Sequence, residues 1–80
     1  MLQIGRTYSF KTLTFYYIGE VTRLYPSHAE IKNGQEVYET GPNREYYAGK
    51  VKASEPIPDG YLVPITGGVI IAPYERIALV

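Results

Sequence analysis

Short runs of β-forming residues, separated by glycine and proline, make up most of the chain. The breakers lie seven to nine residues apart over most of the sequence, at Gly19, Pro26, Gly34, Gly41, Gly49, Pro58–Gly60, Gly67–Gly68 and Pro73. This spacing is typical of short strands in a meander or barrel. The pattern therefore predicts a mainly β fold, a small and highly curved β-barrel of about five to seven short strands.

The N-terminal runs carry the clearest strand composition. Arg6–Phe10 and Leu13–Val21 are rich in Tyr, Phe, Thr, Ile and Val, which favour a pleated, half-buried surface. Lys11–Thr12 forms a turn between these runs, or the two runs form one long bent strand. Further extended segments are expected at Val51–Ala53, Tyr61–Ile65, Val69–Ala72 and Arg76–Val80.

An Asn-Gly pair lies between two alternating runs in the middle of the chain. In His28–Lys32, Ala29 and Ile31 share one strand face, and Gln35–Glu39 follows Asn33-Gly34 directly. Asn-Gly is the strongest short-range hairpin signal, because a type I′ turn requires two positive φ angles. The sequence predicts a hairpin whose turn is Asn33-Gly34.

Two other segments carry local signals of their own. Asn43 can cap a helix, Arg44–Ala48 provides little more than one turn, and Gly49 suits its end, which predicts one helical turn near residues 43–48. Glu55–Gly60 contains two prolines that fix φ and restrict the residues before them, so this segment is predicted to be a rigid turn.

The C-terminal third is apolar with almost no polar alternation. The pattern predicts strands at Val69–Ala72 and Ile77–Val80 whose two faces must both be buried. A free edge on such an apolar strand favours pairing with another chain. A chain of 80 residues buries only about 63% of its surface on folding. We therefore expect a homo-oligomer formed through residues 69–80; the alternative is that both segments lie inside one barrel.

Composition narrows the class of protein. The 80 residues form one domain, residues 1–80, and a 45% apolar content with zero formal charge excludes intrinsic disorder. The same neutrality argues against extended nucleic acid as a partner, because affinity for a phosphate polymer requires many cations. The chain has no cysteine and shows no apolar stretch long enough for a signal peptide or a membrane span, so we expect a cytoplasmic protein that does not bind membranes.

The sequence contains few residue combinations that could carry out catalysis. The single histidine, His28, follows Ser27 directly, and neighbouring strand residues point to opposite faces, so this pair is not expected to form a catalytic dyad. One histidine, one aspartate and scattered glutamates do not give the spacing of a metal site, and Gly67-Gly68 lacks the lysine of a phosphate-binding loop. We expect a non-enzymatic protein with no catalytic residues, no metal and no cofactor.

Residues suited to binding a ligand are more frequent than residues suited to catalysis. Nine tyrosines include the doublets Tyr16-Tyr17 and Tyr46-Tyr47, and on a strand one ring of each doublet points inward and the other outward, where it can stack on a base. Two loops combine a cation with hydroxyl groups, which suits a compact ligand with few phosphates. The candidate ligand-binding residues are Lys11, Thr12, Thr14, Tyr16, Thr40, Gly41, Arg44 and Tyr46.

Three stretches together resemble a known group of proteins. Arg6–Val21, Glu39-Thr40-Gly41 and Glu55–Gly60, followed by Val-Ile-Ile-Ala-Pro-Tyr ending at Tyr74, are similar to small phage-encoded proteins with an Sm-like or SH3-like barrel. Such proteins include anti-CBASS sponges, which sequester the host's cyclic oligonucleotide signals without cleaving them. The resemblance implies an Sm/SH3-like β-barrel and a cyclic oligonucleotide as the ligand.

The leading hypothesis is therefore a phage anti-defence protein in the host cytoplasm that binds and sequesters a cyclic nucleotide immune signal. In it, Lys11 and Arg44 contact phosphates, Thr12 and Thr40 donate hydrogen bonds, and an exposed Tyr16 or Tyr46 stacks on a base. One alternative is an Sm-like ring that binds RNA or DNA. Another is a protein-binding inhibitor or structural phage component that adds its apolar C-terminal strand to a partner.

Overall fold

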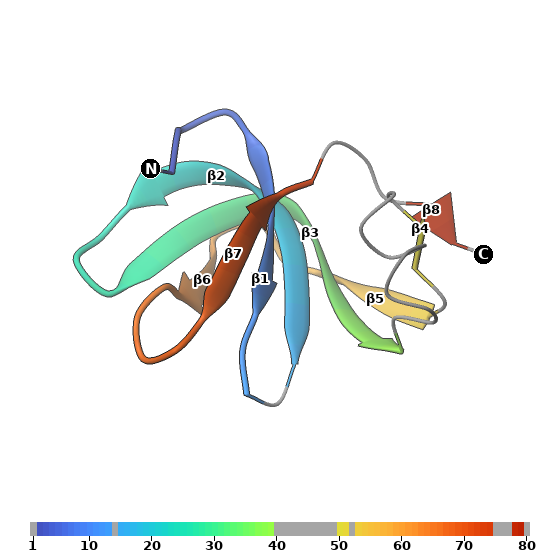
Figure 1. Ribbon diagram of the computed structural model, residues 1–80. Helices are drawn as coiled ribbons and strands as arrows, with labels where there is room; N and C mark the ends of the chain where they lie inside the picture. The colour runs from blue at the N-terminus through green and yellow to red at the C-terminus, as the bar shows by residue number, and fades with distance from the viewer. Residues whose placement is uncertain (1, 14, 40–49, 52, 75–77, 80) are drawn as a thin grey trace.

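The protein is mainly β. A computed structural model describes residues 2–13, 15–39, 50–51, 53–74 and 78–79 (Figure 1), and no helix occurs among them. The predicted helical turn near residues 43–48 lies outside this range. The strands are β1 (Thr7–Lys11), β2 (Tyr16–Leu24), β3 (His28–Glu39), β4 (Lys50–Val51), β5 (Ala53–Ile57), β6 (Tyr61–Pro64), β7 (Ile70–Pro73) and β8 (Ala78–Leu79).

Six of these strands form one antiparallel sheet. Their order is β5-β3-β2-β1-β7, and β6 pairs with β3 beside β5. The sheet curves strongly, but no ladder between the described strands joins β6 to β7, so a closed barrel is not formed (Figure 1). β4 and β8 form a separate parallel pair at one side of the sheet, beyond β5.

The first two strands form a hairpin, which decides between the two arrangements expected for Lys11–Thr12. β1 and β2 pair antiparallel, with Lys11 opposite Tyr16. The Thr12 N–H donates to the Phe15 carbonyl at 2.9 Å, which joins the two sides of the turn between β1 and β2. The chain therefore turns here and does not continue as one bent strand.

The hairpin predicted at Asn33-Gly34 is wrong, because β3 runs through this pair without turning. β3 pairs with β2 along one edge, while its other edge pairs first with β6 and then, from Gly34 onward, with β5. The register with β2 shifts between Ile18 and Glu20, where β3 carries one extra residue. Asn33 has φ of 51°. The positive φ that would suit a turn here forms a β-bulge.

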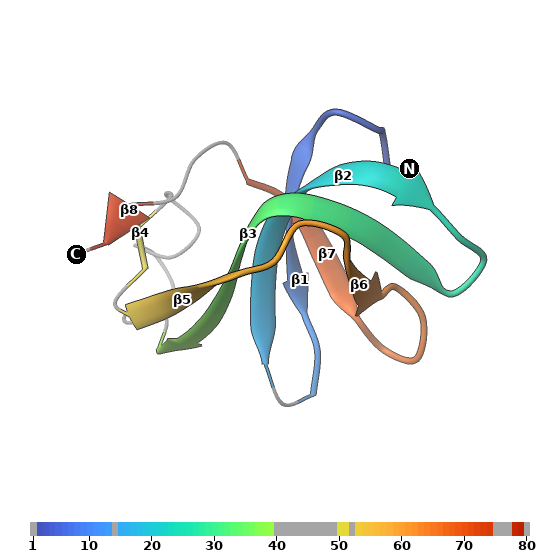
Figure 2. The same cartoon turned by 180° about the vertical axis from the view of Figure 1, so that it is seen from behind.

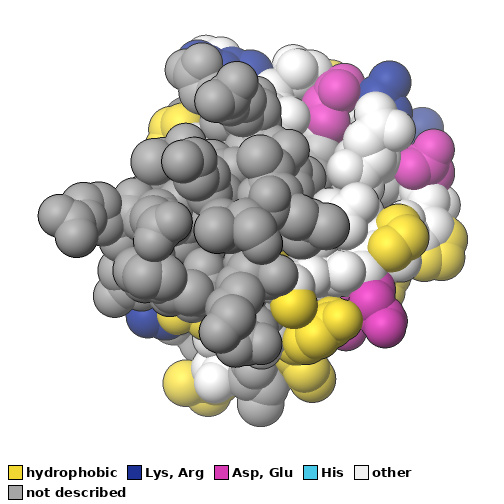
Figure 3. All heavy atoms as spheres, turned by 90° about the vertical axis from the view of Figure 1, so that its right-hand side faces the viewer, with side chains coloured by type: hydrophobic (Ala, Val, Ile, Leu, Met, Phe, Trp, Pro, Cys, Tyr) yellow, Lys and Arg dark blue, Asp and Glu magenta, His cyan; other side chains and the backbone are white. Residues whose placement is uncertain are grey.

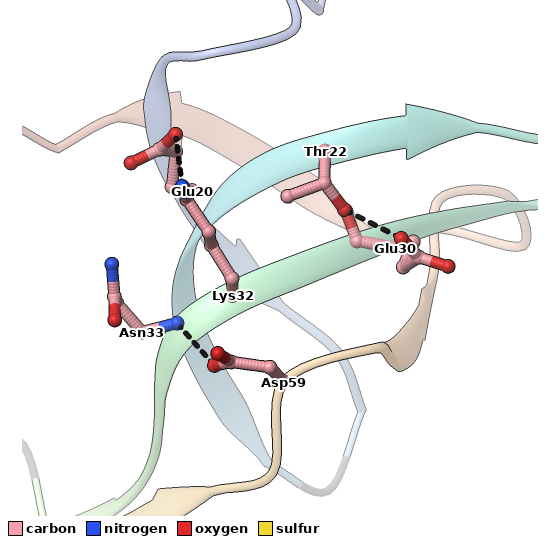
Figure 4. Close-up of polar contacts among 6 residues, drawn as sticks. All are labelled: Glu20, Thr22, Glu30, Lys32, Asn33 and Asp59. Carbon is pink, nitrogen blue, oxygen red and sulfur yellow. Dashed lines mark hydrogen bonds and ion pairs between the residues drawn. The ribbon is translucent and has the colours of Figure 1, made fainter.

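The bulge is fixed by the connection between β5 and β6, which runs along β3 (Figure 2). The Asn33 N–H donates to the Asp59 carboxylate at 2.9 Å (Figure 4), and the Gly60 N–H donates to the Ile31 carbonyl at 2.9 Å. The rigid turn predicted for Glu55–Gly60 is therefore correct only at its end. Its first three residues lie in β5, because Pro56 occupies an edge strand that can tolerate a missing N–H.

Two apolar clusters pack on opposite faces of the sheet, and β2 contributes to both. The second cluster consists of Ile18, Val37 and Tyr74, with Tyr16 packed against it. The main cluster contains Tyr8, Phe10, Tyr17, Val21, Ala29, Ile31 and Val63. Successive side chains of a strand point to opposite faces, so the buried residues Tyr17 and Ile18 serve different clusters.

The apolar segment after the β6–β7 loop is covered on one face. Val69 and Ile71 pack against the main cluster, whereas Ile70 is 56% exposed. The homo-oligomer expected through residues 69–80 stays a prediction, and residues 75–77 and 80 lie outside the described part. Within the described residues, no helix has the length and apolar character needed to cross a membrane.

Both strands that flank the open side of the sheet end in proline. The Tyr74 N–H donates to the Thr7 carbonyl, and the Ile65 N–H donates to the Ser27 carbonyl. Because successive N–H groups of a strand alternate in direction, the N–H missing at Pro73 and at Pro64 would have pointed to the free edge. Both prolines thus remove donors that another strand could use.

Restoring these two donors should promote self-association. We expect the double variant Pro64→Thr/Pro73→Thr to form larger and more concentration-dependent species than the parent, as measured by size-exclusion chromatography with light scattering. The matched control is Pro26→Thr in the β2–β3 loop, which should behave like the parent. Equal masses for the parent and the double variant would show that these prolines do not protect the edges.

Gly34 is predicted to be intolerant of a side chain. A Cβ at this position would lie 2.9 Å from Ile57 Cγ1 and 3.0 Å from Ile31 Cδ1. Gly34→Ala should therefore lower the free energy of unfolding by about 1–3 kcal/mol, and each kcal/mol should lower Tm by about 4–8 °C in a domain of this size. Adding Ile57→Val, which shortens the obstructing side chain, should recover part of the loss in thermal unfolding. A parent-like Tm for Gly34→Ala would contradict the close approach.

Candidate functional site

The structure describes three of the eight candidate ligand-binding residues, and it brings them together. Lys11, Thr12 and Tyr16 lie at the end of the β1–β2 hairpin. The other five candidates, Thr14, Thr40, Gly41, Arg44 and Tyr46, lie outside the described residues. The candidate site is therefore built from the hairpin end and its neighbours.

Lys11 and Tyr16 form a cation–π pair across the hairpin. They are opposite each other in the ladder, and the Lys11 Nζ lies 5.5 Å from the centroid of the Tyr16 ring. Such pairs contribute about 0.5–1 kcal/mol at exposed positions. No carboxylate side chain among the described residues lies within ion-pair distance of Lys11.

The neighbouring groups limit what each candidate can offer a ligand. The Tyr16 ring packs against the second apolar cluster as well as under Lys11. The Thr12 hydroxyl donates to the Phe15 carbonyl at 2.7 Å and accepts from the Phe15 N–H at 3.0 Å. A ligand that took a hydrogen bond from Thr12 would compete with the turn for it.

The two rings of the first tyrosine doublet lie on opposite faces of the sheet, as strand alternation predicts. Tyr17 is buried in the main cluster, whereas Tyr16 is half-buried and packs against the second cluster instead of standing free in solvent. The second doublet, Tyr46-Tyr47, lies outside the described residues. Tyr17, the inward member of the first doublet, lines a hollow that could not be predicted from the sequence.

This hollow lies between the β1–β2 turn and the β6–β7 loop, which point in the same general direction (Figure 1). Its volume is about 270 Å³, and it is lined by Thr12, Leu13, Tyr17, Pro64, Thr66, Gly67 and Val69. We call it the hairpin-end hollow. Leu13 at its rim is 97% exposed.

Aromatic rings continue from the hollow into the molecule. The ring centroids of Phe15 and Tyr17 are 6.3 Å apart, and those of Tyr17 and Tyr61 are 5.6 Å apart, both in tilted arrangements. Phe15 is 42% exposed. Strand alternation from Tyr17 would have placed Phe15 on this face, but nothing local in the sequence indicates that Tyr61 joins them.

The Tyr17 phenol beneath the hollow is held in the neutral form. Burial raises the pKa of Tyr17 well above its usual range, and the hydroxyl–hydroxyl hydrogen bond with Tyr61 at 3.5 Å, together with the nearby Glu36 carboxylate, raises it further. On the opposite face, burial raises the pKa of Tyr74 to about 12. Near neutral pH these groups offer hydroxyl donors and carry no charge.

Ser27 and His28 are in contact, so the expectation that they point apart is wrong. The Ser27 Oγ lies 2.9 Å from His28 Nδ1. Ser27 precedes β3 and does not follow strand alternation, which explains the difference. Among the described residues, no group of three or more histidine, cysteine or carboxylate side chains is placed to hold a metal ion.

Surface charges are mixed and weakly paired. Lys32 and Glu20 form an ion pair at 3.7 Å with both side chains partly exposed (Figure 4), and such pairs contribute about 0–1 kcal/mol. On the face shown in Figure 3, acidic and basic side chains lie next to each other.

Comparisons with known proteins do not extend this description. No protein-family model matches the sequence, and no curated protein or solved structure is significantly similar to the chain.

Alkaline pH should destabilise the fold through its buried phenols. An unfolded tyrosine ionises near pH 10, whereas the pKa of folded Tyr74 is about 12. The stabilisation from the neutral phenol is complete below about pH 10 and is lost as the pH rises toward 12, because ionisation favours the unfolded chain. We expect Tm to fall steeply over this interval.

Two tyrosine variants test whether Tyr74 causes the fall of Tm at alkaline pH. Tyr74→Phe should make the fall of Tm with pH shallower, because one titrating group is removed. Tyr25→Phe, which alters a 40% exposed phenol, should leave the slope unchanged. Identical slopes for the parent and Tyr74→Phe would show that Tyr74 does not contribute.

Proposed function

We propose that this protein is a non-catalytic binding module that sequesters a compact nucleotide, a cyclic di- or trinucleotide signal. The proposal rests on one observation. An ammonium group, Lys11 Nζ, is held over the Tyr16 ring at the end of the β1–β2 hairpin, and the other face of the same hairpin end carries Tyr17 and the hairpin-end hollow. A cation for phosphate at the same hairpin end as apolar and aromatic surface for a base is the combination that a small nucleotide requires.

The roles follow from the positions of the groups. Lys11 would contact a phosphate, and the cation–π contact limits the conformations that its long side chain loses on binding. The exposed Phe15 ring and the wall of the hairpin-end hollow would receive a base, since every base has an apolar π-face. A cyclic nucleotide places bases next to phosphates and could reach both.

The electrostatics favour a small ligand over a polymer. The chain is neutral overall, with eight lysine and arginine residues and eight aspartate and glutamate residues. A long phosphate backbone needs a continuous basic groove, whereas a ligand with two or three phosphates needs few cations. An Sm-like RNA-binding ring is therefore the less favoured alternative.

The test is thermal unfolding against a panel of cyclic di- and trinucleotides, linear mononucleotides and a short RNA. A ligand at 100 times its Kd stabilises the fold by about 2.7 kcal/mol. Each kcal/mol raises Tm by about 4–8 °C in a small domain. We expect a shift of this size with a cyclic nucleotide, and unchanged nucleotide recovered after denaturation.

Matched variants locate the site. Lys11→Gln should abolish the shift, while Lys32→Gln, which removes a lysine paired with Glu20, should retain it. A panel without any shift overturns the proposal and leaves a protein-binding or structural role. A shift with RNA alone that weakens steeply with salt favours the nucleic-acid alternative.

A further inference from the structure

A second hollow lies at the opposite end of β1 from the hairpin turn, where the N-terminal segment meets β7. It has a volume of about 380 Å³, which is within the range of small-molecule sites. Its lining is Leu2, Gln3, Arg6, Tyr8, Ile71 and Pro73. A smaller hollow of about 240 Å³ adjoins it and shares Arg6 and Pro73. We call the two together the Arg6 site.

The backbone around Arg6 is firmly held. The Gly5 N–H donates to the Val21 carbonyl at 2.8 Å, and the Val21 N–H donates to the Arg6 carbonyl at 2.9 Å. The Gln3 N–H donates to the Tyr8 hydroxyl at 2.8 Å, which ties the N-terminal segment to the sheet below it. The Arg6 side chain thus leaves a fixed backbone position, between the two hollows.

The larger hollow has an apolar floor. Tyr8 is 6% exposed and belongs to the main cluster, and Leu2 and Ile71 pack against that cluster. This surface suits a flat or branched hydrocarbon group, which would gain about 25 cal/mol for each Å² it removes from water. Polar groups would lose hydration here without replacement.

The rim supplies a cation, the guanidinium of Arg6. Arg6 is exposed, and no carboxylate among the described residues forms an ion pair with it. A guanidinium group can bind a carboxylate through two parallel hydrogen bonds. The smaller hollow, lined by Gly5, Arg6, Thr7, Pro73 and Tyr74, leaves room beside the guanidinium for such a head group.

We propose that the Arg6 site binds an amphipathic organic anion: a carboxylate joined to an apolar body about the size of one aromatic ring. The body lies over Tyr8 and Ile71, and the carboxylate pairs with Arg6. The site is separate from the hairpin-end hollow, and the proposal is independent of the nucleotide function.

An NMR titration of the full chain tests the proposal with three probes: 3-phenylpropionate, its uncharged analogue 3-phenylpropanol, and acetate. We expect 3-phenylpropionate to cause saturable shifts in the amide signals of Gln3, Arg6, Tyr8 and Ile71. The alcohol should bind at least about tenfold more weakly, and acetate should cause no saturable shift, because each lacks one half of the required chemistry.

Two arginine variants complete the test. Arg6→Gln should weaken 3-phenylpropionate binding by about tenfold or more while leaving the alcohol unchanged. Arg23→Gln is the control, because Arg23 is an exposed arginine on β2 that contacts Tyr25 and is not among the residues that line either hollow. Equal affinities for acid and alcohol, parent-like binding by Arg6→Gln, shifts centred on the hairpin end, or no saturable shift at millimolar probe would each overturn the proposal.

Discussion

The bulge at Asn33-Gly34 is the constraint on which the sheet depends. β3 is the longest strand and pairs with β2, β5 and β6. β5 and β6 can share one edge of β3 only because the strand bends between them, where Asn33 takes a positive φ and Asp59 holds its N–H. Gly34 lets Ile57 approach the backbone closely. The bend thereby sets where Val63 enters the main cluster and where Tyr61 packs against Tyr17, which lines the hairpin-end hollow.

The sequence predicts the type of structure here better than its arrangement. β composition and breaker spacing predict a β-rich chain, and alternation correctly separates Tyr16 from Tyr17. The hairpin prediction at Asn33-Gly34 is wrong because the local sequence signal, a readily accessible positive φ, is the same for a turn and for a bulge. What decides between them is the pairing of Gly34 with Ile57 and of Ile31 with Tyr61, and no local pattern contains those contacts.

In the candidate site, too, contacts between residues close in sequence could be predicted and contacts between distant segments could not. Lys11 and Tyr16 could be found because a hairpin brings neighbours in sequence together. The hairpin-end hollow could not, since the β6–β7 loop that forms its other wall is distant in sequence. The Arg6 site was missed for the same reason: it needs the N-terminal segment to meet β7. Strand alternation also failed at Ser27 and His28, where the chain is not yet a strand.

The pairing of β1 with β7 has a consequence for how the chain acquires its structure. The first strand of the sheet completes its ladder with the last strand of the same sheet, so almost the whole chain must be present before β1 is covered. β1, β2 and β3 can pair as each is synthesised, because their contacts are between neighbours. A nascent chain that has reached only the β6–β7 loop still presents β1 as an open edge. Closing so long a loop costs conformational entropy, which places the β1–β7 ladder late in folding.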